Sequence, residues 1–301
     1  ALTIVGEEGV SDDEFKLTIA EGGSLTSSGT ITNTSHDTLV EGVLTNNGTA
    51  NYDDMTIAEG GQSINTVFEQ GDILTIAQGG THTNTGTSIW NNKTVGGSAS
   101  NGANASEDIN GVFDIVAGGD YTNDGKLDAT GTPTTNVAGE LTNNKSGEAL
   151  YDDMTISDGG SSTNHGYEKG DILTVEEGGT HTNTGTSIWN NKTVAGSSEN
   201  TGKEYIDGTF DIEAGGDYTN KGDLDATDTE TTNVAGDLVN DKDGTAHYDD
   251  MDIADGGTST NNGYEEGDIL DIGGDWTNNG ESHWNNIVVG EGGETHFGSD
   301  S

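Results

Sequence analysis

The chain has 301 residues, with 54 acidic residues against 9 basic ones and a formal net charge of −45, and only 28% of its residues are hydrophobic. This charge excludes nucleic acid and anionic membrane surfaces as expected partners, because their phosphates would be repelled. The chain contains no cysteine and no apolar run of about 18 residues, so neither disulfides nor membrane insertion are expected. Low hydrophobicity with high charge is typical of disorder, but the regular spacing of the sequence predicts an ordered fold with a thin core.

Residues 1–16, ALTIVGEEGVSDDEFK, are predicted to form a segment of their own. Within it, Leu2, Thr3 and Ile4 repeat a strand phrase that returns many times later in the chain. We therefore expect a partial coil that either caps the fold or is donated to the last turn of a neighbouring molecule. Residues 17–301 are predicted to form the solenoid described next.

A short phrase recurs from residue 17 onward. It consists of apolar-x-Ile/Val, a corner with glycine, and then apolar-Thr-Asn-x-Gly, as in LTIAQGGTHTNTG at 74–86 and MTISDGGSSTNHG at 154–166. Apolar residues alternate with polar ones in short runs broken by Gly and Asn, which predicts strands and turns rather than helices. Because the phrase returns after about 19 residues, the fold class is predicted to be all-β, a single parallel β-solenoid of about 15 coils.

Aligned on this phrase, the coils share one apolar column and one asparagine column. Like residues should then lie above one another at the spacing of neighbouring strands, about 4.8 Å. Stacked asparagine amides can hydrogen-bond to the amides of the coils above and below. The predicted structural ladder includes Ile57, Ile76, Val95, Ile115 and Val137 in the apolar column and Asn65, Asn84, Asn101, Asn123 and Asn143 in the other.

The repeated L-T-I-x-x-G-G and L-T-N-N-G phrases resemble those of secreted bacterial parallel β-helix adhesins, of the filamentous-haemagglutinin and autotransporter-passenger type. The resemblance covers almost the whole chain. It implies export and an extracellular or cell-surface location, and it is more specific for architecture than for function.

A longer repeat of five coils overlies the short one. The segment GGTHTNTGTSIWNNKTV occurs without change at 79–95 and 178–194. If the five coil types are named A to E, the chain reads DE-ABCDE-ABCDE-ABC, so its last coil is in phase with the first coil of a second copy. No cap rich in Pro or Lys is evident, and such caps are what keep solenoids and sheet edges from stacking. The expected contacts between copies are Leu2, Ile4, Val288, Val289 and Phe297.

The pattern therefore predicts a structural subunit of an extracellular filament or surface matrix, assembled by head-to-tail stacking of solenoid ends. The alternative is a non-polymerising cell-surface adhesin or stalk, with surface glycans as partners. Enzyme activity is not expected, because residue pairs repeat throughout and no single site stands out. The expected partner in the first hypothesis is the protein itself.

An acidic column lies four residues before the Ile/Val column. Stacked carboxylates would repel one another at about 5 Å, and a calcium ion bridging carboxylate and amide oxygens would reverse that effect. The other interpretation is a row of solvated Asx turns. No cofactor is required in either case, and calcium is the one candidate ion. The column consists of Asp53, Asp72, Asn91, Asp152, Asp171, Asn190, Asp249, Asp268 and Asn285.

Aromatic and histidine positions also recur once per five coils. Trp90, Trp189 and Trp284 could stack on sugar rings if exposed, but such a Trp more often fills a wide part of a core. His82 and His181 fall at an inward-facing position and are interpreted as interior groups with hydrogen-bond partners, not as metal ligands.

Overall fold

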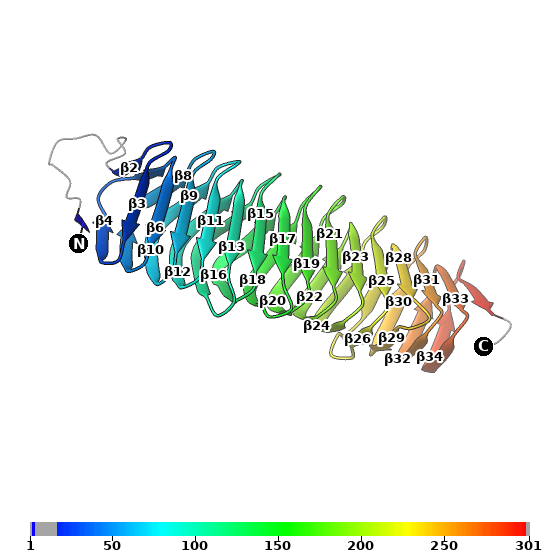
Figure 1. The fold of residues 1–301 in the computed structure, drawn as a ribbon. Helices are drawn as coiled ribbons and strands as arrows, with labels where there is room; N and C mark the ends of the chain where they lie inside the picture. Colours follow the sequence, from blue (N-terminus) through cyan, green and yellow to red (C-terminus); the bar gives the residue numbers. More distant parts are fainter. Residues whose placement is uncertain (1, 4–16, 299–301) are drawn as a thin grey trace. The chain divides into compact units, whose positions relative to one another are not determined.

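A computed structural model describes residues 2–3 and 17–298 (Figure 1). The chain divides into two compact units, Ala1–Asp152 and Asp153–Ser301, and the boundary falls within strand β18. The fold prediction is confirmed: the chain is an all-β parallel β-solenoid of about 15 coils of about 19 residues, and the described residues contain no helix. Accordingly, none of the described residues belongs to a helix that could cross a membrane.

In the first unit the coils contribute to two parallel sheets. The sheet that carries the asparagine column, called the Asn sheet, consists of β3 (Ser24–Ser27), β6 (Val43–Asn46), β9 (Gln62–Asn65), β11 (Thr81–Asn84), β13 (Ser98–Asn101), β15 (Asp120–Asn123) and β17 (Glu140–Asn143). The sheet that carries the apolar column, called the Ile/Val sheet, consists of β1 (Leu2–Thr3), β2 (Leu17–Ile19), β4 (Thr30–Asn33), β5 (Thr38–Val40), β7 (Thr49–Tyr52), β8 (Asp54–Ile57), β10 (Phe68–Ile76), β12 (Thr87–Val95), β14 (Ser106–Ile115), β16 (Lys126–Val137) and β18 (Glu148–Ile156).

The second unit has the same two kinds of strand. Its Asn sheet consists of β19 (Ser161–Asn164), β21 (Thr180–Asn183), β23 (Ser197–Asn200), β25 (Asp217–Asn220), β28 (Asp237–Asn240), β31 (Thr258–Asn261), β33 (Asp275–Asn278) and β35 (Glu294–Phe297). Its Ile/Val sheet consists of β20 (Tyr167–Val175), β22 (Thr186–Val194), β24 (Lys203–Ile212), β26 (Asp223–Ala226), β27 (Thr232–Val234), β29 (Thr245–Tyr248), β30 (Asp250–Ile253), β32 (Tyr264–Ile272) and β34 (Glu281–Val289).

Glycine forms the corner between the two strands of a coil. Gly60 has a φ of +78°, in the left-handed region that residues with a side chain rarely adopt. The next residue, Gly61, passes so close to the previous coil that an added Cβ would lie 2.0 Å from the carbonyl oxygen of Val40. The Gly-Gly pair of the repeated phrase therefore serves two needs, a backbone angle and a close approach of two coils.

The core is a thin column of stacked side chains. Ile57 pairs in register with Ile76, and Ile76 pairs with Val95. Val95 in turn pairs with Ile115, which pairs with Val137, and all five side chains are buried. Strands of the Asn sheet alternate between exposed and buried residues, as in β15, so each strand places every second side chain inside. Because each side chain contacts like neighbours, 28% hydrophobic residues suffice for a closed core.

The asparagine column forms a hydrogen-bonded ladder inside the first unit. The Nδ2 of Asn65 donates to the Oδ1 of Asn84 over 2.9 Å, and the Nδ2 of Asn84 donates to Asn101 over the same distance. Asn101 continues the ladder to Asn123, and Asn123 continues it to Asn143. These side chains are buried, so their amides satisfy one another where water is excluded.

Candidate functional site

The structure brings the members of the acidic column into short hydrogen-bonded groups. The Nδ2 of Asn91 donates to the Oδ1 of Asp72 over 2.8 Å, and the backbone N–H of Asp72 donates to the carbonyl oxygen of Asp53. In the second unit, Asn190 donates to Asp171 and Asn285 donates to Asp268, each over 2.6 Å. The amide of each Asn thus acts as a donor toward a carboxylate, which offsets repulsion between stacked acids without an ion.

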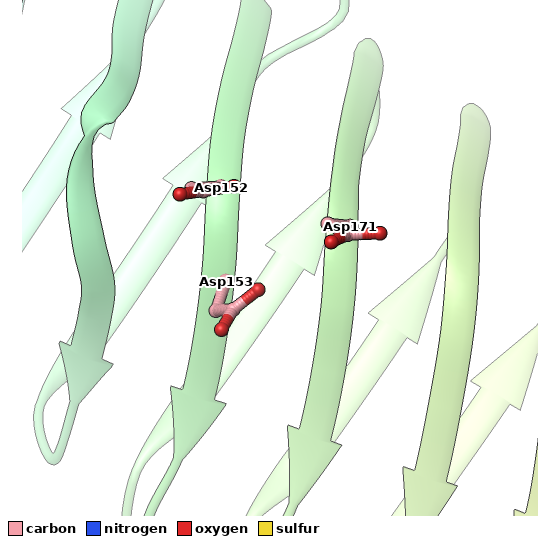
Figure 2. A group of neighbouring side chains, drawn as sticks. All are labelled: Asp152, Asp153 and Asp171. Atoms are coloured by element: carbon pink, nitrogen blue, oxygen red, sulfur yellow. The ribbon is translucent and has the colours of Figure 1, made fainter.

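One part of the acidic column is more crowded. Within the second unit, Asp153 on β18 and Asp171 on β20 each offer a carboxylate oxygen, and these two oxygens lie within 4.8 Å of each other (Figure 2). Asp152 and Asp171 are exposed to solvent. Exposed acidic groups of this kind are common without a bound ion, so this cluster alone assigns no metal site. In the first unit, burial raises the pKa of Asp54, and nearby carboxylates raise it further.

A buried polar network, absent from the sequence-based prediction, lies inside the first unit. The Nε2 of His82 and the Oε1 of Glu69 lie 2.7 Å apart and share a hydrogen bond. Ser88 donates to the same oxygen of Glu69, and the Nε1 of Trp90 donates to Ser88. All four side chains are buried and linked by these hydrogen bonds, but the Oε2 of Glu69 and the Nδ1 of His82 are buried without a hydrogen-bond partner.

Next to it lies a buried ion pair. The Nζ of Lys93 lies 2.5 Å from the Oε1 of Glu107, the Tyr121 hydroxyl donates to Oε2 over 2.6 Å, and Lys93 lies over the Tyr121 ring. Burial disfavours the charged form of Glu107, but Lys93 and His82 outweigh it and hold the pKa of Glu107 below its usual value. Burial and the neighbouring Glu107 raise the pKa of Tyr121 well above its usual value. We call Lys93, Glu107 and Tyr121 the buried triad.

The second unit repeats both groups. His181 bonds Glu168, Ser187 donates to Glu168, and Trp189 donates to Ser187. The second copy of the buried triad is formed by Lys192, Glu204 and Tyr218, with the same hydrogen bonds. The unchanged segment at 79–95 and 178–194 supplies the His, Ser, Trp and Lys of each network. The need to form the same buried network twice is a physical reason why the two segments have the same sequence. The interior roles expected for His82, His181, Trp90 and Trp189 agree with this geometry.

The network occurs a third time around Glu265, but without the His and the Lys of the first two copies. Glu265 stands where Glu69 and Glu168 stand, but Trp276 replaces the His, and its Nε1 donates to Glu265. Ser282 and Trp284 also donate to Glu265. Burial raises the pKa of Glu265 to about 7, although these three hydrogen bonds lower it in part.

We expect the second unit to lose stability as the pH rises from 4.5 to about 7, because folded Glu265 holds its proton longer than unfolded Glu265 does. Glu265→Gln should remove this loss, so that the variant gains about 3 kcal/mol relative to the native protein between pH 4 and pH 8. Thermal unfolding across that range measures the difference. The matched Glu168→Gln change instead replaces the carboxylate that bonds His181 and Ser187 by a neutral amide and should destabilise. A constant difference between Glu265→Gln and the native protein at all pH values would contradict the prediction.

No protein-family model matches the sequence, and no curated protein shows significant similarity to it. A solved structure does. The chain is similar to the TibA55-350 fragment in its TibC-catalysed, hyper-glycosylated form, with 17% sequence identity and a TM-score of 0.46. The match covers 94% of this chain and 96% of that chain.

The last coil that the structure describes carries exposed apolar side chains. Among the described residues, β34 pairs with β32 on one side, and no strand pairs with its other side. Ile287 is 44% exposed and Val289 is 51% exposed, whereas Leu270 and Ile272, their partners one coil earlier, are fully buried. Phe297 is 65% exposed. We call Ile287, Val288, Val289 and Phe297 the C-terminal end face.

At the other end, the structure places part of the predicted contact segment. Leu2 and Thr3 form β1, which pairs in parallel with Ile31 and Thr32 of β4 in the same chain. Ile4, and the remainder of the predicted donor segment up to residue 16, lie outside the described residues. The backbone of Leu2 thus occupies the edge of the N-terminal coil.

Proposed function

We propose that this protein is a structural subunit of an extracellular filament or surface matrix, in which the C-terminal end face of one copy stacks on the N-terminal coil of the next. The observation that carries this proposal is the C-terminal end face itself, a parallel sheet edge on which the inward-facing Ile287 and Val289 are about half exposed. An added coil would bury them and extend both sheets, which is the geometry of strand addition. The proposal assigns no catalytic residue and requires no cofactor.

The net charge of the chain supports growth at the ends. With 54 acidic residues, the outward positions repel another copy laterally, while the C-terminal end face is apolar and the acidic Glu281 and Glu294 lie at the beginnings of its two strands. Neither β34 nor β35 contains Lys or Pro, the residues with which natural proteins often protect an open sheet edge. We therefore expect association through the end face.

Purified protein should form filaments visible by electron microscopy and should sediment as species larger than one chain, increasingly so at higher concentration. Val289→Lys should abolish this, because it places a charge on the surface to be buried. The matched control is Val67→Lys, since Val67 is 50% exposed but belongs to a turn within the first unit. A native protein that stays monomeric at high concentration would refute the proposal, and equal effects of both variants would assign association to charge alone.

A second candidate function is a non-polymerising surface adhesin that binds glycans. An open groove in the second unit favours it, lined by Tyr248, Glu266, Asp268, His283 and Trp284. Trp284 is only partly buried and stacks on Tyr248 at a centroid distance of 6.0 Å. Aromatic faces next to carboxylates are suited to sugar rings. Binding to a glycan panel that is lost in Trp284→Ala, with no filaments in the native protein, would favour this alternative.

A further inference from the structure

We use the word joint for the contact between two successive coils. One type of joint inside each unit has a charged interior, whereas the corresponding positions at the first and last described coils are apolar. Where β12 pairs with β14, the buried triad spans the joint: Lys93 lies on one strand and Glu107 on the next, and Tyr121 follows on β15. The joint between β22 and β24 carries the second copy of the triad. A joint of this type is therefore polar and charged in its interior both times that it occurs within the described chain.

On the C-terminal side, the lysine position of this joint is apolar. Lys93 pairs with Leu74 of the preceding strand, and Lys192 pairs with Leu173. In the third occurrence, Leu270 pairs with Ile287. Ile287 thus takes the register position of the two lysines, and β34 carries no cation there.

On the N-terminal side, the glutamate and tyrosine positions are also apolar. Glu204 pairs with Leu224 of the following coil, and Leu2 pairs with Ile31, which holds the same register position as Leu224. The tyrosine position follows the same rule. Tyr218 pairs with Leu238, and Leu25 pairs with Leu44. Leu2 and Leu25 thus stand at the register positions of the Glu and the Tyr.

From these matched replacements we infer that the joint between two copies is an apolar version of the buried triad, in which Ile287 of one copy meets the coil that carries Leu2 and Leu25 of the next. This inference rests on the proposed function and specifies its contact. Continuing the internal register across the joint places Ile287 opposite Leu17, Ser282 opposite Leu2 and Thr295 opposite Leu25.

The replacements have a physical reason in how the two kinds of joint form. Inside a unit, the Lys and the Glu belong to one chain and become buried together during folding. Between two copies, each charge would first be exposed on a separate molecule, and both would have to lose their water on contact. Apolar residues avoid this cost and gain from the burial of their surface. A contact between two copies therefore favours an apolar residue at the Lys position of one copy and at the Glu position of the other.

Restoring one charge tests the inference. Ile287→Lys should raise the concentration needed for assembly by roughly 100-fold, because the new ammonium would be buried without its carboxylate. Ile287→Met, which keeps the position apolar, should assemble as the native protein does. Both variants should keep the melting temperature of the monomer, since Ile287 is 44% exposed there.

Restoring the partners should reverse the defect. Adding Leu2→Glu and Leu25→Tyr to Ile287→Lys rebuilds the triad across the joint and should recover at least ten-fold of the lost assembly, whereas Leu2→Glu and Leu25→Tyr alone should assemble poorly. If Ile287→Lys assembles as well as the native protein, or if the added changes bring no recovery, the inference is wrong while filament formation stands. If the native protein itself does not assemble, the proposed function fails first.

Discussion

Replacing Lys93 by Met is expected to destabilise the first unit by about 3–5 kcal/mol, because the change strands a buried carboxylate. Neither Lys93 nor Glu107 has any exposed side-chain surface. Without Lys93, Glu107 would retain the hydrogen bond from Tyr121 but would lose the charge that holds its pKa low. The loss should therefore shrink as the pH is lowered, since protonation neutralises the stranded group.

Urea unfolding followed by circular dichroism measures the loss, and hydrogen exchange of β12 and β14 locates it. Hydrogen exchange is needed because a repeat protein can unfold in parts. Lys126→Met is the matched control: Lys126 is exposed and its bond to Asp128 is 3.5 Å long, so a change below about 0.5 kcal/mol is expected.

Replacing all three residues of the buried triad tests whether the loss of stability comes from the stranded charge or from altered packing. Lys93→Met, Glu107→Leu and Tyr121→Phe together should recover most of the stability, because apolar groups of similar volume can substitute for a buried ion pair. The chain itself carries Ile287, Leu2 and Leu25 at these register positions. A triple variant as unstable as the single one would show that packing, and not the charge, decides the effect.

Replacing Asn84 by Ala is expected to cost about 2–5 kcal/mol, since one side chain makes four hydrogen bonds in the ladder. Its Oδ1 accepts from Asn65 and from the backbone N–H of Gly86. Its Nδ2 donates to Asn101 and to the carbonyl oxygen of Ser106. The alanine would leave buried polar groups without partners, and each such group costs about 1–3 kcal/mol.

Thermal and urea unfolding test this prediction alongside two variants. Asn84→Asp keeps an acceptor but loses both donors and turns an oxygen toward Asn101, so it should be at least as unstable as the alanine variant. Asn47→Ala removes an exposed Asn from the same type of corner and should change stability by less than about 0.5 kcal/mol. Equal losses at Asn47 and Asn84 would contradict a special role for the ladder.

The coil height and the two columns could be predicted from the sequence because they depend on a local rule. Alternation with period two and a glycine corner return the chain to the same place one strand higher, so Ile57, Ile76 and Val95 must stack. The same rule contained a signal for the buried triad. Lys93 lies two residues before Val95, and alternation alone therefore turns it inward.

The partners in the network could not be read from local spacing. Glu107 lies 14 residues after Lys93, and Glu69 lies 13 residues before His82, and both meet their partners only because coils stack. A charge inside a thin core also contradicts the usual distribution of Lys and Glu, so composition favours the surface for both. In the acidic column, the predicted stacking places Asn91 beside Asp72, and the direct hydrogen bond from the amide to the carboxylate is a detail that spacing alone does not predict.

The hydrogen bonds of the asparagine ladder inside each unit all point in the same direction along the coils. Every amide in it passes its hydrogen onward: Asn46 to Asn65 in the first unit, and Asn240 to Asn261 and Asn261 to Asn278 in the second. The amide dipoles are therefore aligned and strengthen one another along the row. Two rows joined with the same orientation would keep this alignment, whereas two rows facing each other would oppose their dipoles. The asparagine side chains therefore give each unit a direction in addition to the direction of its backbone. This alignment of dipoles disfavours a pairing in which two chains face each other in opposite orientations.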